Sequence, residues 1–251
     1  MDHPFQDQVV FISGASSGIG FALGRAFQAA GAIVAGSSRC AERLPTWLDQ
    51  GVVLDVTDPD SVVAGCAAVE QAQGRVDILV NNAGIGLFMA WEETSMRDYQ
   101  HIMDVNFYGA VRVTQALLPG MLERSSGTLV NISSVAGERG YARHTAYCAS
   151  KHAMLGWSKG MRKDLTGSGV HVVDICPPAI DTPFFENAGF HDYREKHPGL
   201  SLMSPEEVAT QTLLAVARGE RGRILGLRAK ALWLLDTLAP ASIDLLQRLK
   251  G

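Results

Sequence analysis

A glycine-rich turn lies between an apolar run and a helical segment near the start of the chain. Residues 9–12 read Val-Val-Phe-Ile, which is typical of a buried strand, and Gly14, Gly18 and Gly20 follow within the next turn. Glycines let the backbone turn tightly and approach a pyrophosphate, and the next helix offers unpaired N–H groups to the anion. The spacing G-x-x-x-G-x-G differs from the dinucleotide fingerprint G-x-G-x-x-G. In this position it indicates a nucleotide-binding α/β domain, although such glycines also mark simple tight turns.

Apolar runs alternate with longer amphipathic segments along the whole chain. Strands that are apolar throughout and separated by helices favour a parallel sheet covered on both faces. The sequence therefore predicts a single Rossmann-like α/β domain over residues 1–251, doubly wound around about seven strands. The expected strands are 9–12, 33–37, 51–54, 76–81, 127–133, 170–175 and 223–227. The expected helices are 18–30, one starting at Asp58, one from Thr94 or Ser95 towards Leu122, 145–165, and one starting at Ser204.

Composition excludes several classes of partner. The 251 residues are 47% hydrophobic with a formal net charge of −4, so no basic excess favours nucleic acid. Neither a secretory signal nor an apolar stretch long enough to span a bilayer is recognisable, and we expect a cytoplasmic protein. The four cysteines are scattered, which favours a reduced compartment, and the seven histidines lack metal-ligand spacing, so no metal is expected.

The end of the second expected strand bears on which nicotinamide cofactor fits. An acidic residue there binds the adenosine ribose of NAD, whereas a basic residue pairs with the 2′-phosphate of NADP. This strand ends in Ser37, Ser38 and Arg39, without an acid. Arg39 is therefore predicted to clamp the phosphate, which favours NADP(H) over NAD(H); a solvated surface arginine is the alternative. Asp55 is predicted to accept from the adenine amino group, or to cap the helix near Thr57.

Tyr147 and Lys151 lie four residues apart in an expected helix, so their side chains share one face. A free tyrosine has a pKa of about 10 and is a poor base at neutral pH. A neighbouring ammonium favours the phenolate and is expected to lower that pKa. The pair is therefore a candidate acid–base centre, although surface helices also carry this spacing. Cys148 beside it is expected to be a packing residue.

Together with other motifs, this pair resembles the classical short-chain dehydrogenase/reductase family. The matching motifs run in the family's order from about Gln8 to Thr182, and they are specific in combination although each is weak alone. They are Gly14-x-x-x-Gly18-x-Gly20, Asn81-Asn82-Ala83-Gly84, Asn106, Ser133-Ser134 and Tyr147-x-x-x-Lys151.

The resemblance implies a role for each catalytic position. Tyr147 would protonate the developing alkoxide as hydride arrives from the nicotinamide, and Ser134 would hydrogen-bond the substrate oxygen. Lys151 would bind the nicotinamide ribose hydroxyls and lower the pKa of Tyr147. Asn106 would hold a water that joins Lys151 to a proton relay. Ser133 is expected to be structural.

The resemblance also implies a cofactor site built from several loops. Residues 82–84 would pack near the adenosine ribose and steady the central sheet, whereas for Asn81 a structural role is at least as well supported. Ile180 and Thr182 match positions that contact the nicotinamide carboxamide. The full predicted cofactor set is Gly14, Ser16, Ser17, Gly18, Ile19, Gly20, Ser38, Arg39, Asp55, Val56, Asn82, Ala83, Gly84, Tyr147, Lys151, Pro177, Ile180 and Thr182.

The chain departs from the family pattern in three places. Ser13 replaces the commoner threonine but retains a hydroxyl. Pro177-Pro178 replaces Pro-Gly, and because the second proline removes an N–H and stiffens the turn, its path stays open. An apolar extension over 229–251 follows the last expected strand. We expect it to pack against the core; another subunit, a lipidic substrate or a membrane surface are the alternatives.

The segment 182–203 mixes aromatic residues with charges and follows the sixth expected strand. Because open α/β sheets bind ligands at that edge, it is predicted to be a substrate lid, with a plain surface loop as the alternative. The candidate pocket-lining residues are Phe88, Met89, Trp91, Tyr141, Phe184, Phe185, Phe190 and Tyr193.

These features predict an NADP(H)-dependent oxidoreductase that transfers hydride between the nicotinamide and a ketone or secondary alcohol. A carbonyl reductase for a bulky or apolar substrate fits best. One alternative is a catalytically silent NADP(H)-sensing regulator of the same fold, which would not need all four catalytic residue types. Another is an epimerase or dehydratase, for which 251 residues leave little room. The resemblance further implies a homodimer through the long helices that carry Asn106 and Tyr147.

Overall fold

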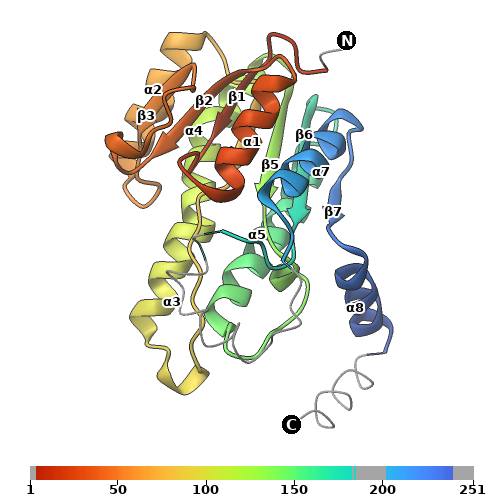
Figure 1. Ribbon diagram of the computed structural model, residues 1–251. Helices are drawn as coiled ribbons and strands as arrows, with labels where there is room; N and C mark the ends of the chain where they lie inside the picture. Colours follow the sequence, from red (N-terminus) through yellow and green to blue (C-terminus); the bar gives the residue numbers. More distant parts are fainter. Residues whose placement is uncertain (1–3, 183, 185–201, 240–251) are drawn as a thin grey trace.

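A seven-stranded parallel sheet forms the centre of the protein in the computed structural model, which describes residues 4–182, 184 and 202–239 (Figure 1). The strand order is β3-β2-β1-β4-β5-β6-β7, so the chain reverses its direction of winding between β1 and β4. This confirms the predicted Rossmann-like, doubly wound sheet. The strands are β1 Val9–Ile12, β2 Ile33–Ser38, β3 Gln50–Val53, β4 Ile78–Asn81, β5 Gly127–Ile132, β6 Val170–Cys176 and β7 Gly222–Ile224.

Helices cover both faces of the sheet, as the continuously apolar strands predict (Figure 1). Alternate residues of each strand enter different cores. On β1, Val10 and Ile12 pack with Phe27 in the core under α1 and α7. Val9 and Phe11 pack in the opposite core under α2 and α4. The α-helices are α1 Gly18–Ala29, α2 Pro59–Gln73, α3 Met96–Met103, α4 Gly109–Glu123, α5 Thr145–Asp164, α7 Pro205–Ala217 and α8 Leu227–Leu238.

The expected long helix from residue 94 or 95 towards Leu122 is present over residues 96–123, but it contains a π-helical turn that the sequence did not predict. Ser95 caps α3, but a π-helical turn, η3 (Asp104–Tyr108), separates α3 from α4. Short 3-10 turns add η1 Ala41–Arg43, η2 Trp91–Glu93 and η4 Val135–Gly137. Isolated π turns are frequent at functional sites. This one contains the buried Asn106, a predicted catalytic residue.

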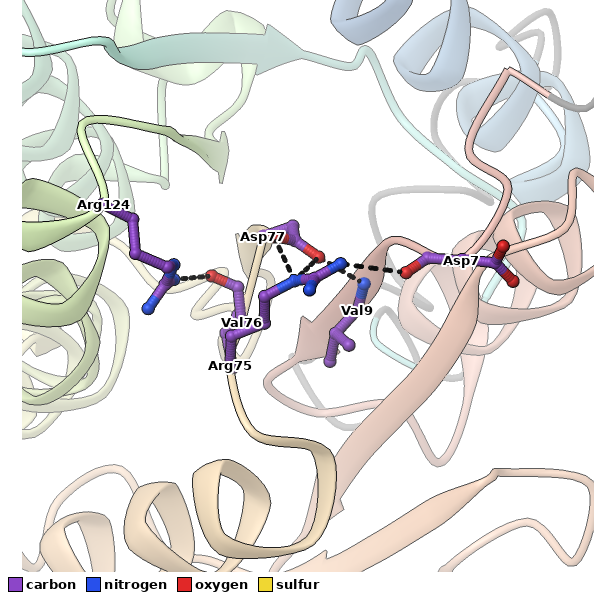
Figure 2. A network of polar contacts seen from close by, with 6 residues as sticks. All are labelled: Asp7, Val9, Arg75, Val76, Asp77 and Arg124. Carbon is purple, nitrogen blue, oxygen red and sulfur yellow. Dashed lines mark hydrogen bonds and ion pairs between the residues drawn. The ribbon is translucent and has the colours of Figure 1, made fainter.

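The edge of the sheet opposite the carboxyl ends of the strands is held by a polar network (Figure 2). The Asp77 carboxylate accepts from the Val9 backbone N–H at 2.8 Å and from Arg75 Nε at 2.9 and 3.0 Å. Arg75 also donates to the Asp7 carbonyl, and Arg124 donates to the Val76 carbonyl at 2.9 Å. Asp77 therefore fixes the start of β1 beside the start of β4.

Asp77→Ala is expected to lower the free energy of unfolding by roughly 2 kcal/mol, because a backbone N–H loses its charged acceptor. Arg75→Ala should cost less than about 1 kcal/mol, since the guanidinium is half exposed and surface ion pairs contribute little. Urea titrations of both variants measure the difference. Equal losses would contradict the dominant role of the Val9 contact.

The C-terminal extension starts earlier than expected and does not enter the core. β7 ends at Ile224, and α8 begins at Leu227 instead of residue 229. No residue of α8 is buried, so the expectation that this segment packs against the core is wrong for its described part. Residues 240–251 lie outside the described residues. Within the part of the chain that the structure describes, no helix is both long and apolar enough to cross a membrane.

Candidate active site

The glycine-rich turn follows β1 and ends at the N-terminus of α1. Gly14 and Gly18 have φ values of 71° and 53°, a region that residues with a Cβ rarely adopt. Gly20 has no room for a Cβ, which would collide with the Gly14 carbonyl oxygen and the Asn82 amide. Ser17 caps α1 without a side-chain hydrogen bond to it. The turn therefore leaves the first N–H groups of α1 available to an anion.

Asn82 fixes this turn to the end of β4. Its Nδ2 donates to the carbonyls of Ser13 and Gly14 at 3.0 and 2.9 Å. The Ser13 hydroxyl in turn accepts from the N–H groups of Asn82 and Ala83 at 3.0 and 3.1 Å. Ser13 therefore uses the hydroxyl that it shares with the commoner threonine. Asn82 therefore holds the predicted cofactor turn against the end of β4.

The carboxyl end of β2 combines two buried serines with an exposed arginine. Ser37 accepts from the Gly14 N–H at 3.3 Å, and Ser38 accepts from the Cys40 N–H at 3.3 Å. Arg39 is exposed. Partial burial raises the pKa of Asp55, but hydrogen bonds from Thr57 and the charge of Arg39 outweigh it and lower that pKa.

The structure accounts for one of the two expected roles of Asp55. Its Oδ1 accepts from both the backbone N–H and the hydroxyl of Thr57, at 2.9 and 2.8 Å. These contacts organise the turn before α2, where Asp58 is the N-cap residue. Val56 beside it is buried, and its carbonyl accepts from Arg112 at 3.1 Å.

Tyr147 and Lys151 lie on one face of α5, as their spacing predicts. The Lys151 Nζ lies 5.8 Å from the centre of the Tyr147 ring and donates to the Ile132 carbonyl at 2.9 Å. Lys151 is buried, whereas Tyr147 is half-buried. The carbonyl of Ile132, at the end of β5, therefore helps to fix the ammonium near the phenol.

Burial controls the protonation of both groups. Burial raises the pKa of Tyr147 to about 12, although hydrogen bonding with the Ser134 side chain opposes this shift. Burial also lowers the pKa of Lys151 to about 8. The net shift in the pKa of Tyr147 is therefore upward, opposite to the lowering expected from the neighbouring ammonium, and burial is its largest cause.

Asn106 is wholly buried and its side chain connects three segments. Its amide donates to the Ile85 carbonyl and the Ser150 hydroxyl at 2.9 and 3.0 Å, and its Oδ1 accepts from the Ile85 N–H at 2.8 Å. Ser150 then donates to the Tyr147 carbonyl at 2.8 Å. A Cβ added to Gly84 would lie 3.2 Å from Asn106 Oδ1 and 3.8 Å from Lys151 Nζ. Asn106, Gly84 and Lys151 are therefore close neighbours in the site.

The two adjacent serines after β5 have different contacts. Ser133 is buried and its hydroxyl donates to the Lys151 carbonyl, which agrees with the expected structural role. Ser134 begins the turn η4, and its hydroxyl accepts from the Ala136 N–H at 3.1 Å. The carbonyl of Pro177 accepts from the Val135 N–H at 3.0 Å. The Pro177-Pro178 turn is therefore fixed beside the serine loop, and no peptide bond among the described residues is cis.

The remaining predicted cofactor positions surround this centre. Ser16 and Ile19 are half-buried in the glycine-rich turn, while Ile180 is buried and pairs with Met203. The Thr182 side chain lies beside Gly18, because a Cβ at Gly18 would be 3.1 Å from Thr182 Cγ2. The segment after β6 thus meets the turn after β1.

Aromatic rings lie beside His144, the N-cap residue of α5, and beside Tyr147 in the first turn of that helix. The ring of Phe88 lies 4.3 Å from the His144 ring, and the Tyr141 ring lies 6.0 Å from it. The Phe184 ring lies 5.9 Å from the Tyr147 ring. Trp91, also expected in the pocket, is exposed. The other aromatic residues of the predicted lid lie outside the described residues.

Other residues that support the site carried no recognisable signal. The Asn81 amide donates to Thr114 and Asn131, and Asn131 donates to Ser158 of α5 at 2.8 Å. This buried network links β4, β5 and α5, which confirms the structural role of Asn81. The sequence did not point to Ser150, His144 or Asn131, because single polar residues in helices, turns and strands have no pattern of their own. No cluster of possible metal ligands occurs among the described residues.

Comparisons with known proteins agree with this arrangement. The sequence model of the short chain dehydrogenase family matches residues 8–191. The 3-oxoacyl-acyl-carrier-protein reductase FabG of Thermotoga maritima is 35% identical over 237 residues, which cover 88% of this chain and 94% of that protein.

Solved structures of short-chain dehydrogenases and ketoreductases are also similar to this chain. A short-chain dehydrogenase from Streptomyces avermitilis has a TM-score of 0.83 and 32% identity, with 98% of this chain and 97% of that chain covered. A variant of actinorhodin polyketide ketoreductase with NADPH has a TM-score of 0.79 and 28% identity, over 88% of this chain and 95% of that chain.

Proposed function

Because this chain belongs to the classical short-chain dehydrogenase/reductase family of oxidoreductases, which act on alcohol and carbonyl groups, we propose that it is an NADPH-dependent carbonyl reductase. The observation that carries the proposal is the placement of Tyr147 beside Lys151 on α5, with Ser134 in hydrogen-bonding contact with Tyr147. This arrangement can donate a proton to a carbonyl oxygen and stabilise the anion left behind.

The residues present fit a nicotinamide dinucleotide. Gly14, Gly18 and Gly20 leave no side chain between the backbone and a pyrophosphate, and the first N–H groups of α1 face the same turn. Lys151 and Gly84 lie together on the other side of the switch point, where the nicotinamide ribose would bind. When bound, the reduced cofactor supplies the hydride that the protein cannot provide.

Each catalytic residue then has one task. Tyr147 donates its phenolic proton to the substrate oxygen, and Ser134 donates a hydrogen bond to the same oxygen. The Lys151 ammonium stabilises the tyrosinate. Asn106 fixes the backbone at Ile85 and, through Ser150, the first turn of α5, so it acts as a positioning residue.

The protonation state of Tyr147 suits a proton donor. With a pKa of about 12, the phenol is protonated at neutral pH and available as an acid. Oxidation of an alcohol would require the phenolate, which burial disfavours. The phenol is therefore already in the protonated form that ketone reduction requires.

The apolar character of the ring cluster supports a bulky substrate. Phe88, Tyr141 and His144 form one group of rings, and the Phe184 ring packs edge-on against the Tyr147 ring. A panel of aromatic, alicyclic and acyl-chain ketones, with NADPH absorbance as readout, tests the proposal. Turnover restricted to small polar sugars would overturn the apolar substrate class. NADPH binding without turnover of any ketone would favour the sensing regulator instead.

Arg39→Ala is expected to weaken NADPH by roughly 10- to 100-fold, because a charge-assisted contact to phosphate contributes about 1.5–3 kcal/mol. NADH lacks the 2′-phosphate, so its Kd should change little. Fluorescence titration with both cofactors measures the ratio. Equal weakening of NADPH and NADH would refute the phosphate clamp.

The affinity for NADPH is expected to fall as the pH rises through about 8, where Lys151 loses its proton. The Kd should rise roughly three- to tenfold between about one pH unit below and one pH unit above the pKa of Lys151. The reason is that a neutral amine makes weaker hydrogen bonds than an ammonium. Titrations across this range measure the change. In Lys151→Met the dependence should disappear; a dependence that persists in the variant would assign it to another group.

We also propose a homodimer through the faces of η3 and α5. Tyr108 is half exposed there, and the Phe107 ring packs against Tyr108 and Trp157 at 5.1 and 6.1 Å. Exposed aromatic groups of this kind are enriched in protein interfaces. Light scattering after size exclusion tests the dimer.

A further inference from the structure

The helix α8 carries a leucine stripe, which we define as Leu227, Ala231, Leu234, Leu235 and Leu238. These positions are spaced i, i+4, i+7, i+8 and i+11, so they form one face of the helix. In a globular protein such a face is normally turned towards the core. Here Leu227 and Leu238 are 85% and 73% exposed, and Leu234 and Leu235 are about half exposed.

The opposite face of α8 is the better covered one. Ala229, Trp233 and Asp236, also spaced by helical turns, are each partly buried. Figure 1 shows α8 continuing from β7 at the margin of the molecule, beyond the helices that cover the sheet. The apolar face of α8, the leucine stripe, is therefore its more exposed face, the reverse of a usual surface helix.

We propose that the leucine stripe docks on the surface of an anionic phospholipid bilayer. With 3.6 residues per turn, Arg228 and Lys230 fall at the two edges of the stripe, where their stems can lie along the apolar surface and their charges reach lipid phosphates. Residues 227–251 hold four basic and two acidic residues, whereas the whole chain has a net charge of −4. The end of the chain that carries the stripe is thus net basic, while the rest of the chain is net acidic.

The exposed area favours a bilayer over a second copy of the chain. Together, the four leucines of the stripe expose roughly the surface of two and a half whole residues. Even an aromatic side chain buries only about 150–250 Å², whereas a stable protein interface takes about 800 Å² from each partner. A bilayer has no such minimum area and accommodates a narrow apolar stripe flanked by cations.

The position of α8 gives this docking a consequence for the site. A Cβ on Gly226, directly before α8, would lie 3.8 Å from Met203 Cε and 3.9 Å from Pro178 Cγ. Met203 pairs with Ile180, so α8 begins at the two chain segments that bound the residues 182–203. A docked stripe places this side of the active site near the membrane. The docking itself does not depend on the proposed reaction.

Sedimentation with vesicles tests the proposal on the full chain. We use vesicles of phosphatidylcholine alone and with about a third phosphatidylglycerol. The wild type should sediment with the anionic vesicles, and Leu234→Glu with Leu238→Glu should lower the partition coefficient at least tenfold. Val63→Glu is the matched control, because Val63 is 64% exposed on α2. Arg228→Gln with Lys230→Gln should weaken anionic binding roughly tenfold or more, since each basic residue contributes about fivefold.

Two results would overturn the proposal. One is equal sedimentation of the wild type and the double glutamate variant. The other is a wild type that stays in the supernatant with both vesicle types; light scattering that then shows a dimer lost in the glutamate variant would assign the stripe to a second copy. Unchanged circular dichroism and NADPH titration of the variants separate loss of docking from loss of folding.

Discussion

Tyr147→Phe is expected to lower kcat for ketone reduction by roughly 10²- to 10⁴-fold, the contribution of a positioned general acid. Phenylalanine retains the ring that packs against Phe184 and lies beside Lys151, but it has no proton to donate. The Kd for NADPH should therefore change far less than kcat. Steady-state kinetics with the best ketone of the panel, together with NADPH titration, measures both quantities.

Ser134→Ala separates the acid from the group that orients the substrate. This variant leaves the Tyr147 proton in place and removes only a hydrogen bond, so its loss in kcat should be smaller than that of Tyr147→Phe. It also removes the interaction that opposes the raised pKa of Tyr147, so that pKa should rise further. If Tyr147→Phe keeps wild-type turnover, Tyr147 is not the acid.

Gly20→Ala is expected to weaken NADPH on the order of 100-fold, because the displaced turn loses one or two charge-assisted hydrogen bonds to phosphate. A Cβ at this position would meet the Gly14 carbonyl and the Asn82 amide, so the turn must move. Overpacking should also cost roughly 1–3 kcal/mol of stability. Fluorescence titration and urea unfolding measure the two losses.

Gly160→Ala is the matched control for this substitution. Gly160 lies within α5, where an added Cβ meets nothing within 4 Å. Alanine should therefore stabilise the helix by about 0.5–1 kcal/mol and leave NADPH binding intact. If Gly20→Ala behaves like Gly160→Ala, the close approach at the turn is not what the cofactor requires.

Those parts of the fold that depend on local pattern could be predicted from the sequence. Apolar strands and amphipathic helices predicted the parallel sheet, because the apolar pattern of each segment indicates which of its faces is buried. The helix containing Asn106 was predicted, but its π turn was not; Asn106 in that turn contacts Ile85 and Ser150, which are distant in the sequence. Similarly, α8 has the pattern of a core helix, but its stripe faces outward.

The candidate site, like the fold, could be predicted only in part from the sequence. The positions of Tyr147 and Lys151 follow from helical spacing, whereas their pKa values depend on burial between strands and loops that spacing does not describe. The sequence therefore predicted the pair but not the direction of the shift at Tyr147. Gly20 was predicted as a turn residue, while its close approach to Asn82 became evident only in the structure.

Deuterium transfer tests the central claim most directly. NADPH labelled with deuterium at the transferable position of the nicotinamide is incubated with the enzyme and a ketone, and the alcohol product is analysed by mass spectrometry. We expect an alcohol that carries the deuterium on the former carbonyl carbon, formed by the wild type and nearly absent with Tyr147→Phe. NADPH binding without any labelled alcohol across the panel would contradict the proposed reductase.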